Sequence, residues 1–419
     1  MKKTQDTTII AITVVIWTFA VTISRALRMP NDFSEAHWLL DYRFGFMKRG
    51  FVGSLCSLTT NALGLQMTPT LIAILSAIIF CIMSVAMLYI LLSVFRQQQP
   101  RMGLLVLGVV FASSPFVVMS AHLFGYFDAF LYLLAIASVM LVLRGRPLLA
   151  AILSSLPILI HESYLLIGFP LVCLATIGVL TANAERRARW MPYVIGICIP
   201  VAVFLAVSLL QGLSTDAMTL RGQLAGRLDS FEFVASRSKS IALWQTTTFL
   251  EFFNQQIWSF PERILNSSVL ASVGPTLLTI LVFIHSSFRI RVFSPFSIVL
   301  LGLVCAPLAM HAVAWDTARI STYPIAGALI AWWILSETRR AQPVTDEFLL
   351  IALPALFLNV FGNIPLMDGK VERFTILFRL LLYFPAIAFV TTTAVENIRG
   401  DWFREFTEAE SPSKSPTKE

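Results

Sequence analysis

The chain has 419 residues, of which 57% are hydrophobic and only 13% are charged, with a formal net charge of +7. About a quarter of the residues of a typical soluble domain are charged, so this composition excludes an ordinary water-soluble enzyme and predicts a membrane protein with many spans. The excess positive charge is expected to mark membrane topology rather than nucleic-acid binding. A Walker-type phosphate loop, a GxGxxG fingerprint and an HExxH motif are all absent from the sequence, so no nucleotide or metalloprotease site is predicted.

Apolar runs predict about twelve membrane spans, the first of which is an uncleaved anchor because no small-residue cleavage site follows it. The spans are predicted at residues 8–28, 70–95, 103–121, 126–143, 147–162, 164–182, 191–211, 269–288, 294–312, 319–336, 346–362 and 374–395. The predicted fold class is therefore all-α, a polytopic helical bundle over residues 1–400. The polar, Pro/Ser-rich segment 401–419 is predicted to be a disordered cytoplasmic tail.

Basic residues mark every second connection between these spans. The basic connections contain Lys2, Lys3, Arg96, Arg101, Arg144, Arg146, Arg186, Arg187, Arg189, Arg289, Arg291, Arg339, Arg340, Arg399 and Arg404. The positive-inside rule assigns them to the cytoplasm, which predicts a bacterial inner-membrane protein with both termini cytoplasmic. The remaining connections fall on an outer face: 29–69, 122–130, 161–164, 212–268, 311–319 and 364–373. They carry carboxylates, aromatic residues and four of the five histidines, so any chemistry is expected on the outer side.

The first outer loop contains DYRFGFMKRGFVGSL, residues 41–55, in which basic residues lie where the positive-inside rule makes them scarce. Arg43, Lys48 and Arg49 are suited to binding phosphate, and arginine does so as a bidentate donor. The stretch that follows is too short and too polar to span, so it predicts an interfacial helix. The alternative is a basic rim that contacts lipid headgroups.

Acidic residues accompany these cations. The first outer loop also contains Asp32, Glu35, His37 and Asp41. Asp128, in HLFGYFDAF, lies at the mouth of a span, where an ionisable residue usually faces a polar interior. The alternative is an ordinary acid at a helix N-terminus.

Two further outer turns carry candidate residues. His161 and Glu162 are neighbours in PILIHESYLLIGFP. A tight turn there would direct both side chains toward one cavity, and the alternative is a buried His–Glu pair with a structural role. Asp316 and Arg319, in HAVAWDTAR, have the i,i+3 spacing that lets them meet on a helix. They form either a plain ion pair or an arginine that its aspartate orients toward an anion.

Two outer segments add candidates for ligand contact. Arg379, preceded by Lys370 and Arg373, is a candidate for the same phosphate site, the alternative being a side chain that snorkels to the interface. In the loop 212–268, an aromatic-rich amphipathic segment predicts a second interfacial helix. Its candidates for sugar or lipid contact are Trp244, Trp258 and Arg263, and the alternative is an aromatic belt at the membrane interface.

Four of these motifs, DYRFGFMKRGFVGSL, GYFDAF, HESY with a following GFP, and WDTAR, resemble bacterial envelope-polysaccharide proteins of the C-type glycosyltransferase superfamily (GT-C) and related polysaccharide polymerases. The resemblance implies a polyprenyl-phosphate-linked sugar as donor and an acidic residue of the first outer loop as catalytic base. By position the resemblance implies Asp41 as that acid, with Asp32 and Glu35 as rivals. The chain differs from the superfamily in lacking a paired-acid motif in that loop and a large soluble C-terminal domain.

The sequence thus predicts transfer of a sugar from a lipid-linked donor to an envelope glycan or lipid acceptor. Asp41 or Asp128 is the base, the cations Arg43, Lys48, Arg49 and Arg319 hold the phosphate, and His161 and Glu162 orient the acceptor or the base. No cofactor and no metal site are predicted, although the outer carboxylates would permit a divalent cation. Three alternatives stay open: a polymerase or ligase of lipid-linked repeat units, a flippase or transporter, and a non-catalytic scaffold of an envelope assembly.

Overall fold

The computed structural model describes residues 2–46, 48–97, 102–210, 217–234, 240–342, 349–367 and 372–409. Every regular element in these ranges is a helix, which confirms the all-α prediction. Nine helical segments are long and apolar enough to cross a membrane, and three shorter apolar helices lie among them within the described ranges. These segments fall one for one on the predicted spans, as expected for a multi-pass membrane protein.

The bundle is built from the helices that contain these segments. They are α1 (Lys2–Ala26), α4 (Pro69–Gln97), α5 (Met102–Ala112), α6 (Pro115–His122), α7 (Asp128–Leu143), α8 (Pro147–Ile160), α9 (Tyr164–Ile167), α10 (Phe169–Ala182), α12 (Met191–Leu210), α17 (Ser267–Ser287), α18 (Pro295–Cys305), η4 (Ala306–Ala312), α19 (Thr317–Thr338), α20 (Leu349–Phe361) and α21 (Ile376–Ala409). Several spans consist of two helices in succession, α5 with α6, α9 with α10 and α18 with η4. The short basic connection after α10 forms α11 (Ala184–Ala188).

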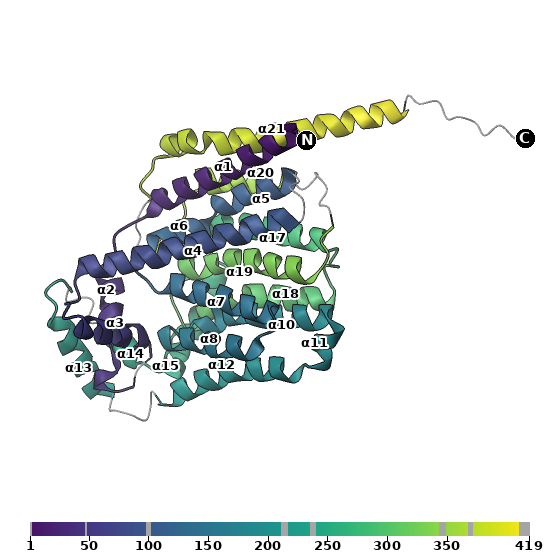
Figure 1. The fold of residues 1–419 in the computed structure, drawn as a ribbon. Helices are drawn as coiled ribbons and strands as arrows, with labels where there is room; N and C mark the ends of the chain where they lie inside the picture. Colours follow the sequence, from purple (N-terminus) through teal and green to yellow (C-terminus); the bar gives the residue numbers. More distant parts are fainter. Residues whose placement is uncertain are drawn as a thin grey trace, which may run out of the picture.

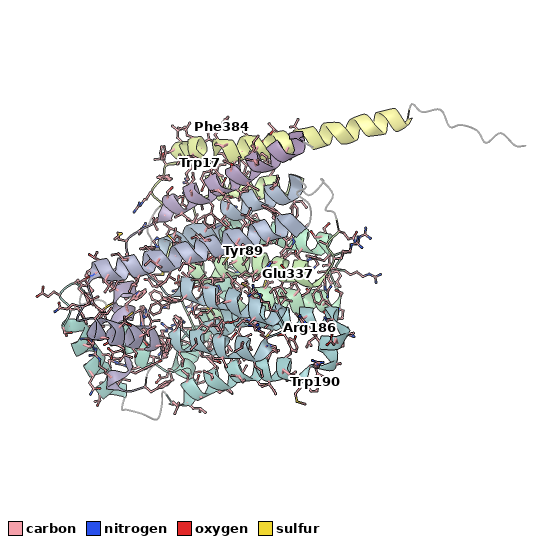
Figure 2. All side chains as sticks on the ribbon, viewed as in Figure 1. Trp17, Tyr89, Arg186, Trp190, Glu337 and Phe384 are labelled. Carbon is pink, nitrogen blue, oxygen red and sulfur yellow. The ribbon has the colours of Figure 1, made fainter. Side chains whose placement is uncertain are left out.

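Burial separates the centre of the bundle from its lipid-facing periphery. The span Thr317–Thr338 is 89% buried, whereas Met191–Leu210 is only 22% buried although it is at least as apolar. An apolar surface left exposed on a long helix is the surface that a bilayer covers. On the flank formed by α1 and α21, Phe384 points outward in this way, whereas the half-exposed Trp17 donates its indole N–H to the Leu382 carbonyl oxygen of α21 (Figure 2).

Short helices occur in the loops at residues 29–69 and 212–268, in each of which the sequence predicts an interfacial helix. They are α2 (Asp32–Leu39), η1 (Tyr42–Phe44) and α3 (Phe51–Ala62) in the first loop, and α13 (Ala217–Asp229), α14 (Ser240–Thr246), α15 (Phe249–Gln256), η3 (Ile257–Ser259) and α16 (Phe260–Ile264) in the fourth. In Figure 1 the labelled helices α2, α3, α13, α14 and α15 gather at one end of the bundle, here called the α3 end, and α11 lies at the opposite end.

Close packing holds the first loop in place. A Cβ added at Gly53 would lie 1.9 Å from the Leu40 carbonyl oxygen, so α3 packs against the end of α2 at a distance that only glycine allows. Helix α3 buries Val52 and turns Leu55 and Leu58 outward. This division into a packed face and an exposed leucine face is that of a helix lying in a membrane interface.

The C-terminal helix extends further than expected. Helix α21 continues to Ala409, so the first part of the segment 401–419, predicted to be disordered, is helical. Residues 410–419 lie outside the described residues.

Candidate functional site: a charged cavity at the α3 end

A cavity of about 570 Å³ opens at the α3 end of the bundle. The first loop, the turn between α8 and α9, the α14–α15 segment, α12 and the start of α19 supply its walls. Side chains from four of the predicted motifs line it, namely His37, Lys48, Arg49, Tyr126, His161, Glu162, Asp316 and Arg319. Segments far apart in the sequence therefore form one site.

One charged cluster joins the first loop to the turn after α8. The Arg49 guanidinium donates to both carboxylate oxygens of Glu162, with Nη2–Oε1 at 2.5 Å and Nε–Oε2 at 2.9 Å. The Lys48 ammonium lies 3.9 Å from the same carboxylate, donates to the Thr247 carbonyl oxygen at 2.7 Å and lies over the Phe252 ring at 4.7 Å. Burial opposes ionisation of Glu162, but Arg49 and Lys48 outweigh it and hold the carboxyl pKa well below its usual range.

Arg49 reaches this position through an unusual backbone conformation. Its φ is +65°, in the left-handed region that non-glycine residues rarely adopt. Such a conformation persists only when surrounding contacts enforce it, and it is enriched at ligand sites. Here the bidentate pair with Glu162 supplies the enforcing contact.

Burial makes the Lys48 amine a weaker base than that of an exposed lysine. Only 5% of the Lys48 side chain is exposed, and this desolvation lowers its pKa to about 8, since Glu162 offsets only part of the cost. The ammonium is therefore protonated at neutral pH and changes charge just above it.

The two histidines of the cavity are neutral. Burial, with Arg49 and Arg319 nearby, lowers the His37 pKa to about 3, and burial also lowers the His161 pKa well below its usual range. His161 Nδ1 accepts from the Ser163 amide N–H at 3.2 Å, so its proton resides on Nε2. Neutral imidazoles at these positions are suited to hydrogen bonding with a ligand and add no charge.

A second charged cluster surrounds Arg319 at the start of α19. Arg319 Nη2 donates to Asp128 Oδ1 at 2.8 Å, and Nη1 lies 3.4 Å from Asp316 Oδ2. The Tyr323 hydroxyl also donates to Asp128 Oδ1, at 2.7 Å. Asp128 therefore orients Arg319 from outside the described cavity lining, while Asp316 lies beside Arg319 in the cavity wall. Burial raises the pKa of the Asp316 carboxyl, and the neighbouring Arg319 only partly reverses this.

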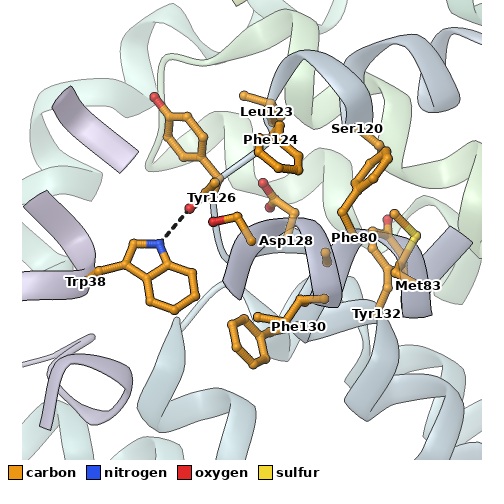
Figure 3. Close-up of a pocket in the computed structure, with 14 residues that line it drawn as sticks. Trp38, Phe80, Met83, Ser120, Leu123, Phe124, Tyr126, Asp128, Phe130 and Tyr132 are labelled. Carbon is orange, nitrogen blue, oxygen red and sulfur yellow. Dashed lines mark hydrogen bonds between the residues drawn. The ribbon is translucent and has the colours of Figure 1, made fainter. Parts of the chain in front are cut away.

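The turn before α7 holds Asp128 in place. Gly125 has φ +98°, and its carbonyl oxygen accepts from Trp38 Nε1 at 2.9 Å, the dashed line in Figure 3. Asp128 also borders a small pocket of about 20 Å³ on this side, together with Trp38 and Tyr126 (Figure 3). The sequence does not reveal the roles of Trp38 and Tyr323, because no local pattern shows that an aromatic residue will hydrogen-bond to a turn far away in the chain.

The structure sets Asp41 and Arg43 apart from the cavity. Neither residue belongs to its described lining. Asp41 caps η1, accepting from the Arg43 amide N–H at 3.1 Å, and its carboxylate pairs with Arg43 Nη2 at 2.5 Å. Asp41 is 1% exposed. Glu35 is likewise outside the lining, and burial with Asp32 nearby raises its pKa.

Arg379 also lies away from the cavity, in a third cluster between α1, α20 and α21. Its Nη1 contacts Glu372 Oε2 at 3.2 Å and donates to the Gly362 carbonyl oxygen at 2.9 Å. Arg25 pairs with the same glutamate and donates to the Asn359 carbonyl oxygen. The structure does not bring Arg379 to the phosphate site predicted for it, and Lys370 lies outside the described residues.

The aromatic residues of the fourth loop divide into two groups. Trp244 lines the cavity, whereas Trp258 is 88% exposed and does not belong to the described lining. Arg263 donates to the Ala314 carbonyl oxygen at 2.8 Å and to the His311 carbonyl oxygen at 3.2 Å, so it braces the segment before α19. Among the residues that the structure describes, no group of three or more His, Cys, Asp or Glu residues is arranged to hold a metal ion.

Comparison with known proteins found no matching family model, no matching curated protein and no matching solved structure. The chemistry of the cavity therefore carries the functional conclusion.

Proposed function

We propose that the protein is a membrane glycosyltransferase that moves a sugar from a polyprenyl-phosphate-linked donor to an envelope glycan or lipid acceptor. The observation that carries this proposal is the convergence of Lys48, Arg49 and Arg319 on one cavity that also has carboxylates and an apolar wall. A lipid-linked phosphosugar needs these three features together: cations for its phosphate, a carboxylate for the acceptor and an apolar path for its lipid.

The lipid part of the donor has a route into this cavity. Phe204 and Val207 of α12 lie in the cavity wall, and α12 is one of the most exposed apolar helices of the bundle. A donor that diffuses in the bilayer therefore meets α12 before it meets the charged clusters. Lys48, Arg49 and Arg319 then bind its phosphate oxygens, partly in exchange for their contacts with Glu162 and Asp316.

Asp316 is the base in this proposal. Its carboxyl lines the cavity, and its raised pKa makes it a stronger base than an ordinary surface aspartate. The acceptor hydroxyl gives its proton to Asp316 while its oxygen attacks the anomeric carbon of the donor. The bond from that carbon to the phosphate oxygen breaks, and the lipid phosphate leaves with the electron pair, stabilised by the cations. Asp128 positions Arg319 and does not contact the reacting atoms.

The orientation in the membrane is part of the proposal. The basic connections include Arg186, Arg187 and Arg189 around α11, at the end of the bundle opposite the cavity (Figure 1). By the positive-inside rule this end faces the cytoplasm of a bacterial inner membrane. The cavity then opens at the outer leaflet, where nucleotide sugars are not supplied and a lipid-linked donor is required.

Bond formation tests the proposal directly. The purified protein in lipid nanodiscs, supplied with radiolabelled polyprenyl-phosphate and polyprenyl-pyrophosphate sugars and a membrane-glycolipid extract, is expected to form a new glycosidic bond. Asp316→Asn is expected to lower the rate by about 10²–10⁴-fold, the usual contribution of a general base. Glu262→Gln, an exposed carboxylate of α16, is the matched control and should leave the rate unchanged. Donor movement across the membrane without a new bond, or a fully active Asp316→Asn protein, would contradict the proposal.

A further inference from the structure

The walls of the cavity differ in chemistry from one side to the other. Leu165, Leu166, Phe204 and Val207, from α9 and α12, form an apolar side next to the lipid-facing helix α12. Phe33, Trp244 and Trp315 form an aromatic side, supplied by α2, α14 and the segment before α19. A lipid chain is suited to the first side, whereas flat rings with polar neighbours are suited to a different ligand.

The aromatic side is a continuous cluster. The Phe33 and Trp244 rings are stacked, with centroids 5.7 Å apart and planes at 12°. Trp315 meets Trp244 edge-on, with centroids 5.9 Å apart and planes at 72°. Trp244 is therefore held between two rings, and Trp315, which is 63% exposed, presents open ring surface.

The backbone around Trp315 is fixed before any ligand binds. Arg263 donates to the Ala314 carbonyl oxygen at 2.8 Å, and the Thr317 amide N–H donates to the Trp315 carbonyl oxygen at 2.9 Å. An exposed tryptophan on a braced segment loses little conformational freedom when it binds a ligand. Trp258, the more exposed tryptophan of the fourth loop, is not part of the described cavity lining and is the residue to expect in an aromatic belt.

Polar groups adjoin the rings. Asp316, the proposed base, directly follows Trp315, and His37, whose Nδ1 contacts the Gln245 side-chain nitrogen at 3.4 Å, belongs to the same cavity lining. A pyranose has one face of C–H bonds, which packs on an aromatic ring, and hydroxyls around its edge, which need hydrogen-bonding partners. Rings with hydrogen-bonding groups at their edges meet both requirements, while a lipid chain would bring no hydrogen-bonding partner to these groups.

We propose that Trp315, backed by Trp244 and Phe33, is the acceptor subsite of the cavity and that its ligand is a saccharide ring. The inference rests on the proposed function and specifies that the acceptor is itself a sugar. A pyranose stacked on Trp315 places its edge hydroxyls beside Asp316, so the ring that binds the acceptor also delivers it to the base.

Binding without turnover tests this subsite. The purified protein in nanodiscs is probed by saturation-transfer NMR with methyl glycosides of glucose, galactose, mannose, rhamnose and N-acetylglucosamine, with no lipid-linked donor present. The wild-type protein is expected to bind at least one of them. Trp315→Leu is expected to weaken that binding about tenfold, the equivalent of one aromatic contact. Trp315→Phe should keep part of it, and Trp258→Leu, the matched control, should keep all of it.

A second probe separates this inference from the proposed function. Decyl phosphate reports on the cations and the apolar wall, and Trp315→Leu is expected to leave its affinity unchanged. Equal weakening of both probes would show that the ring contacts lipid and would overturn the subsite. Unchanged glycoside binding in Trp315→Leu, or no binding of any glycoside to the wild type, would also overturn it. Failure of decyl phosphate to bind the wild type, with glycoside binding intact, would instead contradict the phosphate site.

Discussion

Two clusters of arginine and carboxylate in this protein contain the same chemical groups and differ in what surrounds them. Glu372 is shared by Arg25 and Arg379, and the side chains in this cluster are at most 4% exposed. The pair of Arg49 and Glu162 lines the cavity, and its side chains are 17% and 21% exposed.

The difference in surroundings separates a structural role from a binding role. The arginines of the closed cluster donate to the carbonyl oxygens of Asn359 and Gly362, at the C-terminal end of α20, so they join α1, α20 and α21. The arginine of the cavity has its carboxylate partner and open space beside it. A charge that a ligand can reach exchanges partners, whereas an enclosed charge only stabilises the fold.

The largest expected effect comes from breaking the closed cluster. Glu372→Gln leaves two buried arginines without their carboxylate, and we expect it to lower the free energy of unfolding by about 3–5 kcal/mol. Glu162→Gln should cost much less, because water in the cavity can solvate Arg49. Unfolding in a denaturing-detergent titration, followed by circular dichroism, measures both variants. Equal losses of stability would remove the distinction between the clusters.

A smaller effect concerns the charge of Lys48. Burial lowers its pKa to about 8, and only the ammonium form attracts phosphate, so decyl phosphate affinity should be highest below pH 8 and fall as the pH rises through that value. The expected fall is smaller than about tenfold per pH unit above pH 8, the limit for one essential proton, because Arg49 and Arg319 stay charged and keep part of the binding. Calorimetric titrations between pH 7.5 and 9.5 measure it, a range in which the phosphate is fully ionised. Lys48→Arg stays charged and should give a flat profile; a flat wild-type profile would contradict the assignment.

The smallest expected effect distinguishes the two candidate bases. Asp41 lies outside the described cavity lining and is held by Arg43, so Asp41→Asn should retain transfer within about twofold. It should lose at most about 1 kcal/mol of stability, through the lost ion pair with Arg43, because asparagine caps a helix as well as aspartate does. The measurement is the glycosidic-bond assay, run beside Asp316→Asn. Loss of transfer in Asp41→Asn at normal protein level would favour the base that the sequence predicts.

The spans were predictable because each depends on a local property. A helix that crosses a bilayer must be apolar over about 20 residues, and a sequence window contains that information. The shorter helices in the first and fourth loops were predictable for the same reason, since the lengths and polarity of those segments are local. The gathering of candidate residues at one end of the bundle also followed from the distribution of histidines and carboxylates among alternate loops.

The members of the site were only partly predictable. The sequence singled out Lys48, Arg49, His161, Glu162, Asp316 and Arg319 as candidate site residues, and the structure places all of them in the cavity lining. It also grouped Arg43 and Arg379 with them, and these two lie outside the described lining. Arg43 and Arg49 belong to one short basic stretch, and no local pattern distinguishes the side chain that pairs within the loop from the one that reaches Glu162.

The sequence by itself determined the helical class, the order of the spans and the chemical types available on one side of the membrane. Only the tertiary structure decided which of these residues meet. Arg49 pairs with Glu162, which is 113 residues away in the sequence. Arg319 and Asp128 are 191 residues apart, and Lys48 and Thr247 are 199 residues apart. Such partners are fixed by how the helices pack, because a buried charge is stable only where packing supplies its counterpart. That requirement is a property of the folded bundle and of no single segment.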